Sequence, residues 1–428
     1  MTEPRRRPPR KPYKGKKKPA PGQLTPGADG KLKKVFAGIG VPEQTPFKAD
    51  PFQEEALEAI QYGDCLVTAP TGAGKTWIAE QAIRRTLDQQ GKAWYASPLK
   101  ALTNSKYAEF SEIFGKENIG ILTGDRKENS DAPIIVGTTE ILRNQLYDAM
   151  HRGEDLGTDF VILDEAHYLG DEDRGVVWEE TMIYLPMRIP MLLLSATIGN
   201  ADRISGWLES IRGRTCYVVE ETQRPVPLYP LFMHPSGTLF PLLSGQKSQK
   251  SNLLIYKKVL KFINNKQAAR FRQFHQLPKM GEILRVLNKY CLLPAIFFLK
   301  SRADCDNALP LCPKRAINDD PERKENRCRR IGELVAATPH IADHKQMKYL
   351  KHVGVAAHHS GQLPAWKLLI ETLMTEGLLD AVFATSTVAA GVNFPARTIA
   401  FLNSDRFNGR EFVSLNPTEF HQMTGRAG

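Results

Sequence analysis

Five short apolar runs, separated by helix-like stretches, constrain the fold of the first half of this chain. The runs are CLVTAP, AWYASP, IIVGTT, FVILDEA and MLLLSAT. Between them lie stretches such as PFQEEALEAIQY and KTWIAEQAIRRTL, which have the apolar spacing of helices. Strands that alternate with helices predict an α/β fold with a doubly wound parallel sheet.

A second set of apolar runs predicts a second α/β domain of the same kind. These runs are AIFFLK, GVAAHH, AVFATST and TIAFLNS. A chain of 428 residues is too long for one ordinary core and suits two domains of about 200 residues. We therefore predict a first domain over 35–222, a basic connection over 223–282 and a second domain over 283–428.

Positive charge is concentrated in two segments. The chain has a net charge of +11, of which residues 1–34 contribute +10 and residues 235–281 contribute +9, so the rest is acidic. Residues 1–34 are also rich in proline and glycine, which predicts a disordered basic tail. Such segments suit a polyanion such as nucleic acid, and the alternative is a solubilising tail and a solvated helix face.

Several protein classes are excluded by what the sequence lacks. No apolar run reaches the ~18 residues that a membrane span needs, and the basic N-terminus has no apolar core of a secretory signal. We expect a soluble cytoplasmic protein without a membrane partner, with the nucleus as the alternative compartment. The six cysteines form no CxxC pair, which favours reduced thiols over metal ligands.

The stretch APTGAGKT (69–76) has the context of a phosphate-binding loop, because it follows an apolar run and precedes a helical pattern. Its glycines allow backbone N–H groups to face phosphate oxygens, and the following helix adds its positive end. Lys75 is placed to bind the β- and γ-phosphates, and Thr76 to bind Mg²⁺. Ala69 stands where the strict pattern has its first glycine. The predicted nucleotide-binding residues of this loop are Pro70, Thr71, Gly72, Ala73, Gly74, Lys75 and Thr76.

The stretch VILDEAH (161–167) supplies two adjacent carboxylates at the end of an apolar run. Asp164 can hold Mg²⁺, directly or through water, and Glu165 can polarise the water that attacks a phosphoryl group. Carboxylates at strand ends are often only caps. The phosphate-binding loop about 90 residues upstream favours the catalytic interpretation, with ATP and Mg²⁺ as cofactors.

Eleven motifs in order resemble those of superfamily 2 helicases, most closely the DExH RNA helicases of the Ski-like, exosome-cofactor branch. They are FKADPFQEEA, APTGAGKT, SPLKALTNSK, TGD, GTTEILRNQL, DEAHYLGDEDRGVVWEE, LSAT, IFFLKSR, AAHHSG, ATSTVAAGVNFPAR and QMTGRAG. The resemblance spans about residues 47–428. It implies two RecA-like lobes, ATP bound between them, and movement along single-stranded nucleic acid with unwinding of duplexes.

The resemblance also implies roles around the nucleotide. Phe47 would stack on the adenine, Gln53 would bind its edge, and Gly391 and Asn393 would approach the nucleotide from the second lobe. Gln422 and Arg426 would close over the γ-phosphate.

Two further groups of residues take their roles from the resemblance. His167, Ser195 and Thr197 would couple hydrolysis to lobe movement. Another group would contact backbone phosphates, a task that suits hydroxyls and cations because phosphates carry no sequence information. The members of this second group are Pro98, Lys100, Thr138, Thr139, Arg302 and Thr385.

The last motif stops at Gly428, whereas the family has a further arginine directly after GRAG. Loss of such an arginine can cost about 10³-fold or more in turnover. We interpret the sequence as a fragment truncated within this motif. The alternative is a complete chain that binds ATP and RNA but hydrolyses slowly.

Three functions remain open from the sequence. The first is an ATP-dependent helicase or translocase acting on RNA, single-stranded or partly duplex. The second is a DNA helicase of the related repair branch, because the ATP chemistry is common to both. The third is an ATP-gated RNA clamp with weak hydrolysis.

Overall fold

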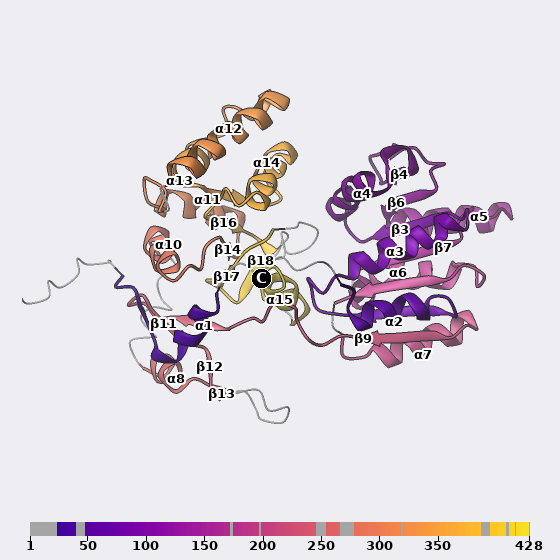
Figure 1. The fold of residues 1–428 in the computed structure, drawn as a ribbon, viewed down its shortest axis with the longest axis horizontal. Coiled ribbons are helices and arrows are strands. Elements are labelled where there is room, and N and C mark those ends of the chain that lie inside the picture. The colour runs from indigo at the N-terminus through magenta and orange to yellow at the C-terminus, as the bar shows by residue number, and fades with distance from the viewer. Residues whose placement is uncertain are drawn as a thin grey trace, which may run out of the picture. The chain divides into compact units, whose positions relative to one another are not determined.

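The structure is a computed structural model, and it divides into two units (Figure 1). Unit 1 joins Met1–Ile39 to Tyr229–Cys291, and unit 2 joins Gly40–Leu228 to Leu292–Gly428. The residues that the structure describes are 24–39, 48–171, 174–196, 198–244, 254–265, 278–317, 320–386, 394–407, 411–415 and 417–427. No helix within these ranges combines the length and the apolar composition needed to cross a membrane.

Unit 2 contains a large sheet built from residues 64–220. Its strands are β2 (Asp64–Thr68), β3 (Ala93–Ser97), β4 (Ile119–Leu122), β5 (Lys127–Glu128), β6 (Ile134–Thr138), β7 (Phe160–Asp164), β8 (Met191–Ser195) and β9 (Cys216–Glu220). Their order is β5-β4-β6-β3-β7-β8-β2-β9. All neighbours pair in parallel except β4 and β5.

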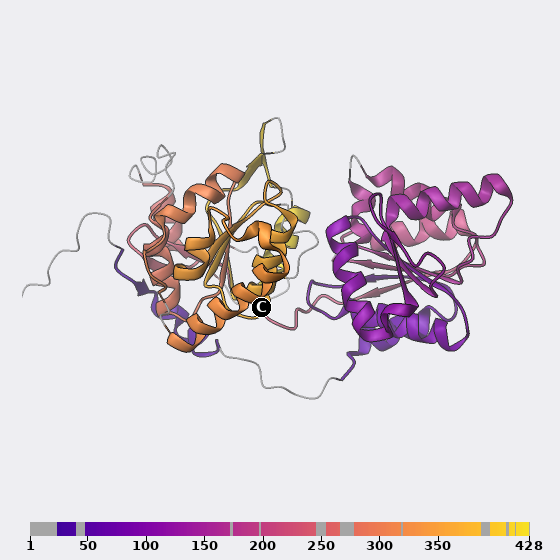
Figure 2. The same ribbon diagram turned by 90° about the horizontal axis from the view of Figure 1, so that it is seen from above.

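Helices cover both faces of this sheet, as Figure 2 shows. They are α2 (Pro51–Ala59), α3 (Lys75–Asp88), α4 (Lys100–Phe114), α5 (Thr139–Arg152), α6 (Gly175–Tyr184) and α7 (Ala201–Arg212). One apolar cluster packs α2, α3 and α4 against one face, and another packs α5, α6 and α7 against the other. The doubly wound parallel sheet that the sequence predicted is therefore confirmed.

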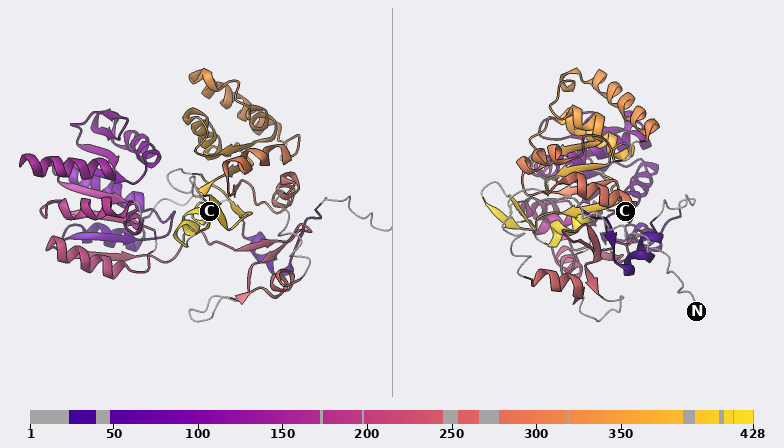
Figure 3. Two further views of the ribbon diagram at one scale, coloured as in Figure 1. Left: turned by 180° about the vertical axis from the view of Figure 1, so that it is seen from behind. Right: turned by 90° about the vertical axis from the view of Figure 1, so that its left-hand side faces the viewer.

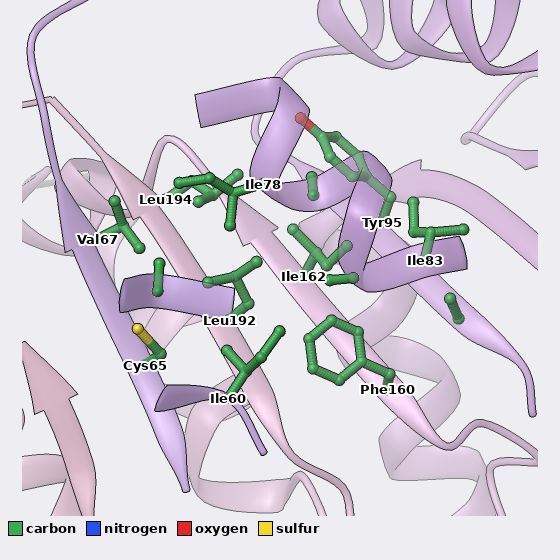
Figure 4. Packing of buried hydrophobic residues seen from close by; sticks show 14 of the residues in the cluster. Ile60, Cys65, Val67, Ile78, Ile83, Tyr95, Phe160, Ile162, Leu192 and Leu194 are labelled. Carbon is green, nitrogen blue, oxygen red and sulfur yellow. The ribbon is translucent and has the colours of Figure 1, made fainter. Parts of the chain in front are cut away.

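Alternation along the strands explains why both faces are apolar. Cys65 and Val67 of β2 lie in the first cluster, which Figure 4 shows, while Leu66 lies in the second. Successive side chains of a strand point to opposite faces, so a strand buried on both sides needs a continuous apolar run. Trp178 of α6 is 1% exposed within the second cluster, which confirms its interpretation as a packing residue.

A second parallel sheet in unit 2 has the order β15-β16-β14-β17. Its strands are β14 (Ala295–Phe298), β15 (Val355–His358), β16 (Ala381–Ala384) and β17 (Thr398–Phe401). Its helices are α11 (Arg302–Ala308), α12 (Pro321–Ala337), α13 (Met347–Val353), α14 (Pro364–Thr375) and α15 (Pro417–Thr424). A short hairpin joins β18 (Asp405–Phe407) to β19 (Phe412–Ser414).

Both faces of this second sheet are also buried. A cluster from α12, α13 and α14 packs on one face. Phe297 and Phe383 are fully buried outside that cluster, with ring centroids 5.2 Å apart. The four predicted strands of the second domain are thus confirmed, and the chain is an α/β protein with two RecA-like parallel sheets.

Unit 1 shows that part of the expected disordered tail is folded. Its strands are β1 (Gly27–Ala28), β10 (Leu231–Met233), β11 (Thr238–Pro241), β12 (Leu243–Ser244) and β13 (Leu254–Ile255). Its helices are α1 (Lys33–Ala37), α8 (Lys257–Ile263) and α10 (Met280–Lys289), and a 3₁₀ turn η1 spans Gly30–Leu32. β1 pairs in parallel with β11, and Figures 1 and 3 show the indigo N-terminal segment among these elements.

The expectation of disorder was therefore wrong for residues 24–34. Leu32 is 3% exposed, so this short segment does bury an apolar side chain. Its partners come from 229–291, about 200 residues later, and composition within the segment cannot reveal them. Residues 1–23 lie outside the described residues.

Candidate nucleotide and nucleic-acid site

The carboxyl edge of the first sheet collects most of the predicted residues. The phosphate-binding loop follows β2, Asp164 ends β7 and Ser195 ends β8, and these three strands are neighbours. Pro98 follows β3, the next strand along, and Thr138 ends β6 beside it. Carboxyl ends of parallel strands meet at one edge, which is where open α/β sheets bind ligands.

The phosphate-binding loop has the backbone that its glycines predict. Gly72 and Gly74 have φ of +85° and +83°, in the left-handed region that favours glycine. A Cβ on Gly74 would lie 2.4 Å from Gln53 Nε2, so a side chain there would displace the glutamine. Gln53 donates to the carbonyls of Ala73 and Gly74 at 3.2 Å, which ties α2 to the loop.

Lys75 begins α3 and folds its ammonium back over the loop. Its Nζ donates to Ala69 O at 2.7 Å and to Pro70 O at 3.1 Å. Burial lowers the pKa of Lys75, and the carboxylates of Glu165 and Asp164 counteract that shift. The three side chains are therefore close enough to interact electrostatically in a partly dehydrated site.

Asp164 is buried at the end of β7 and is held from two sides. Its Oδ1 accepts the backbone N–H of Glu165 at 2.9 Å, and its Oδ2 accepts the hydroxyl of Tyr95 at 2.5 Å. Burial and the adjacent Glu165 carboxylate raise the pKa of Asp164, while Lys106, Tyr95 and Lys75 favour its charged form. The fully buried phenol therefore fixes the orientation of a carboxylate whose charge is costly there.

Glu165 has a backbone conformation that is rare for a residue with a side chain. Its φ is +62° and its ψ is 44°, in the left-handed region. Such strain costs about 1–3 kcal/mol and is found mostly at functional sites. Here it turns the chain sharply between β7 and the 3₁₀ turn η3 (Ala166–Gly170) and leaves the Glu165 side chain 30% exposed.

His167 connects the DEAH stretch to the last helix of unit 2. Its Nε2 is in hydrogen-bonding contact with Nε2 of Gln422 on α15. Burial lowers the pKa of His167 to about 4, so the imidazole is neutral at pH 7. A neutral ring has one donor and one acceptor nitrogen, which lets it join a directional chain of hydrogen bonds.

The segment after α15 also lies against the phosphate-binding loop. A Cβ on Gly425 would lie 2.8 Å from Thr71 Oγ1. Burial lowers the pKa of Arg426, and the Glu165 carboxylate opposes that shift. Arg224 donates to the carbonyls of Gly425 at 3.4 Å and Ala427 at 3.1 Å. The structure thus brings Gln422 and Arg426 to the predicted catalytic carboxylates.

The coupling and phosphate-contact residues occupy the expected strand ends. Ser195 and Thr139 are buried, and the hydroxyl of each is without a hydrogen-bond partner among the described residues. Lys100 begins α4 and pairs with Asp125 at 3.1 Å on the surface. In the second sheet, Arg302 begins α11 after β14, and Thr385 follows the neighbouring strand β16.

Four predicted residues cannot be placed. Phe47, Thr197, Gly391 and Asn393 lie outside the described residues. The roles given to all the site residues, placed or not, stay predictions.

Comparison with known proteins now identifies the first sheet and its helices. Residues 50–204 match the DEAD/DEAH box helicase family. This range includes Gln53 on α2, the phosphate-binding loop and Asp164 with Glu165. Residues 50–204 form a DEAD/DEAH helicase domain. The family uses ATP and binds nucleic acid, which agrees with the phosphate-binding loop and the paired acids at neighbouring strand ends.

Relatives of the helicase domain extend the similarity over both sheets. The chain is 38% identical to a protein named probable helicase HelY from Mycobacterium leprae, over 90% of this chain and 44% of that protein. It is 37% identical to the chloroplastic DExH-box ATP-dependent RNA helicase DExH15 of Arabidopsis thaliana, over 89% of this chain and 36% of that protein. It is 35% identical to the human exosome RNA helicase MTR4, over 90% and 38%. The chain thus spans less than half the length of these relatives.

Three residues of this helicase site escaped sequence reasoning. Tyr95 stands within the apolar run AWYASP, where a phenol looks like one more core ring. Lys106 donates to Thr76 Oγ1 at 2.9 Å, although 30 residues separate them. Arg224 lies in the connection after β9. Only the fold brings these side chains to the site, and no local signal marks them.

Proposed function

We propose that this chain is the ATP-hydrolysing core of an RNA helicase, which moves on single strands and unwinds duplexes. The observation that carries the proposal is the meeting of Lys75, Asp164 and Glu165 with Gln422 and Arg426, which follow the second sheet. A site that gathers residues from both sheets can couple phosphoryl transfer to a change in their arrangement. RNA is supported by relatives of 35–37% identity that are named RNA helicases.

Each side chain of the site has a role in this proposal. Lys75 binds the β- and γ-phosphates, and Glu165 orients and deprotonates the attacking water. Arg426 offsets charge that develops on the γ-phosphoryl group, since such electrostatic stabilisation supplies most of the catalysis of phosphoryl transfer. His167 and Gln422 relay the state of the γ-phosphate to α15.

The residues at Thr76 and Asp164 fit a magnesium ion. Both offer oxygen ligands, which Mg²⁺ prefers, and its sites commonly combine one or two protein ligands with phosphate oxygens and water. Asp164 is buried with a cation, Lys106, favouring its charged form. When bound, Mg²⁺ would neutralise phosphate charge. Tyr95 and the Glu165 N–H would hold the Asp164 carboxylate in place for it.

A track for the nucleic-acid backbone is proposed at the neighbouring strand ends. Pro98 and Lys100 after β3, with Thr138 and Thr139 after β6, lie beside each other because these two strands pair. Arg302 and Thr385 form the equivalent pair after β14 and β16. Contacts of this kind fix the strand without reading its sequence.

ATP turnover tests the proposed function. It is measured with no nucleic acid, with single-stranded RNA and with DNA of the same sequence, and Lys75→Ala provides the blank. Stimulation by RNA alone is expected. Equal stimulation by DNA would replace the RNA assignment with the DNA-helicase alternative. Measurable ATP binding with turnover no higher than the blank would refute hydrolysis by this chain.

Removing the phenol that holds Asp164 is expected to weaken metal-dependent nucleotide binding. In Tyr95→Phe the ring still fills the core, but the buried carboxylate loses one charge-assisted hydrogen bond, which contributes about 1.5–3 kcal/mol. The measurement is the affinity for a fluorescent ADP analogue with Mg²⁺ and with EDTA. We expect affinity in Mg²⁺ to fall about tenfold or more and affinity in EDTA to change little.

Tyr107→Phe is the matched control, because Tyr107 is a buried tyrosine of the same domain whose ring also packs in the first apolar cluster. Equal losses in Mg²⁺ and in EDTA would show that Tyr95 supports the fold rather than the metal ligand.

A further inference from the structure

Unit 1 has an excess of positive charge that the helicase site does not use. Its described residues include nine lysines and arginines but only two acids, Asp29 and Glu282. Asp29 pairs with Lys258 at 2.6 Å. Glu282 pairs with Arg285 and accepts the N–H of Leu24 at 3.1 Å. Both acids are therefore already neutralised within the unit, and most of its cations face solvent.

Six of these cations lie on two segments that are distant in sequence and adjacent in space. Asp29 caps η1 by accepting the N–H of Lys31, and its other oxygen takes Lys258 of α8. The ammonium of Lys31 lies 4.8 Å from the centre of the Tyr256 ring, at the start of α8. We call this surface the basic face. Its members are Lys31, Lys33, Lys34, Lys257, Lys258 and Lys261.

Packing beneath the basic face keeps its lysines outside. Leu32 and Val259 are 3% and 0% exposed, whereas all six lysines are exposed. Lys257 and Lys261 are four residues apart on α8, so they project from the same side of the helix. Lys33, Lys34, Lys257 and Lys261 have no ion-pair partner in the part of unit 1 that the structure describes. Their charges are available to a ligand.

We propose that the basic face is a second RNA-binding surface, which holds the phosphate backbone of a single strand outside the helicase site. This inference rests on the proposed function, because it assigns the additional surface to the same nucleic acid. Exposed lysines without acidic neighbours attract phosphates and release counterions when they bind. RNA is favoured over an anionic membrane because the family to which residues 50–204 belong already binds nucleic acid.

The structure allows a variant that removes charge without removing the fold. Lys258 and Lys31 are left intact because they contact Asp29 and Tyr256. The test variant is Lys33→Gln, Lys34→Gln, Lys257→Gln and Lys261→Gln. The control makes the same change of net charge at four exposed cations of unit 2 that have no ion pair among the described residues. It is Lys116→Gln, Lys314→Gln, Arg315→Gln and Lys324→Gln.

The measurement is the affinity for a labelled single-stranded RNA, without nucleotide, over a series of salt concentrations. We expect the test variant to bind more weakly and to lose about 0.7 of the log–log salt slope for each phosphate contact removed. The control should keep the slope of the original chain. RNA-stimulated ATP turnover at saturating RNA should be unchanged in both variants.

Two results would overturn the proposal. The first is an unchanged salt slope in the test variant, or an equal loss in the control. The second is a loss of binding to phosphatidylserine vesicles with RNA binding intact, which would assign the face to a membrane. Failure of the proposed function is recognised separately, because the original chain would then show no RNA-stimulated turnover whatever its RNA affinity.

Discussion

Glu165→Gln is expected to bind ATP as tightly as the original chain and to hydrolyse it about 10²–10⁴-fold more slowly, the usual contribution of a general base. The amide has the size of the carboxylate and can still orient water, but it cannot take a proton. Glutamine also tolerates the left-handed backbone at this position about as well as glutamate, so the turn after β7 should persist. The measurements are single-turnover hydrolysis and nucleotide affinity.

Glu179→Gln is the matched control, because Glu179 is an exposed glutamate on α6 of the same domain. It makes the same chemical change away from the site and should leave both quantities unaltered. Hydrolysis by Glu165→Gln within about tenfold of the original rate would remove Glu165 from the role of base. A parallel loss of nucleotide affinity would instead indicate that the carboxylate shapes the binding site.

The parallel sheets could be predicted because their signal is local. A strand buried on both faces must be a continuous apolar run, and all nine such runs became strands. Two strands of the first sheet were nevertheless missed. β4 is only four residues long and contains Gly120, and β9 lies at the sheet edge with Tyr217 39% exposed, so neither gives a continuous apolar run.

The site divides in the same way. The phosphate-binding loop and the paired acids announce themselves, because their chemistry needs fixed residue types at fixed spacing. Tyr95 and Lys106 do not, since each acts through a contact made only when separate elements pack together. The folded part of unit 1 is the extreme case. β1 has two residues, and its stability depends on β11, which follows it by about 200 residues.

A buried ion pair beneath the first sheet is expected to dominate the stability of the helicase domain. Arg212 is 1% exposed and Asp64 is fully buried, and Arg212 Nε donates to Asp64 Oδ2 at 2.6 Å. The remaining guanidinium nitrogens donate to the carbonyls of Leu185 and Ile189 at 2.8 and 2.7 Å. One side chain thus satisfies a buried carboxylate and two buried carbonyls, and it joins β2 to α7 and to the segment before β8.

Arg212→Ala should therefore lower the free energy of unfolding of this domain by about 3–5 kcal/mol, because it leaves the Asp64 carboxylate buried without its partner. The measurement is native-state hydrogen exchange of peptides that span β2 and β8, which reports the opening of this region. Arg214→Ala is the control: Arg214 Nε lies 3.9 Å from the other Asp64 oxygen with its side chain 26% exposed. Water can replace that contact, so the control should lose about 1 kcal/mol or less. Equal losses in the two variants would mean that general charge near Asp64, and not the buried geometry of Arg212, holds these strands together.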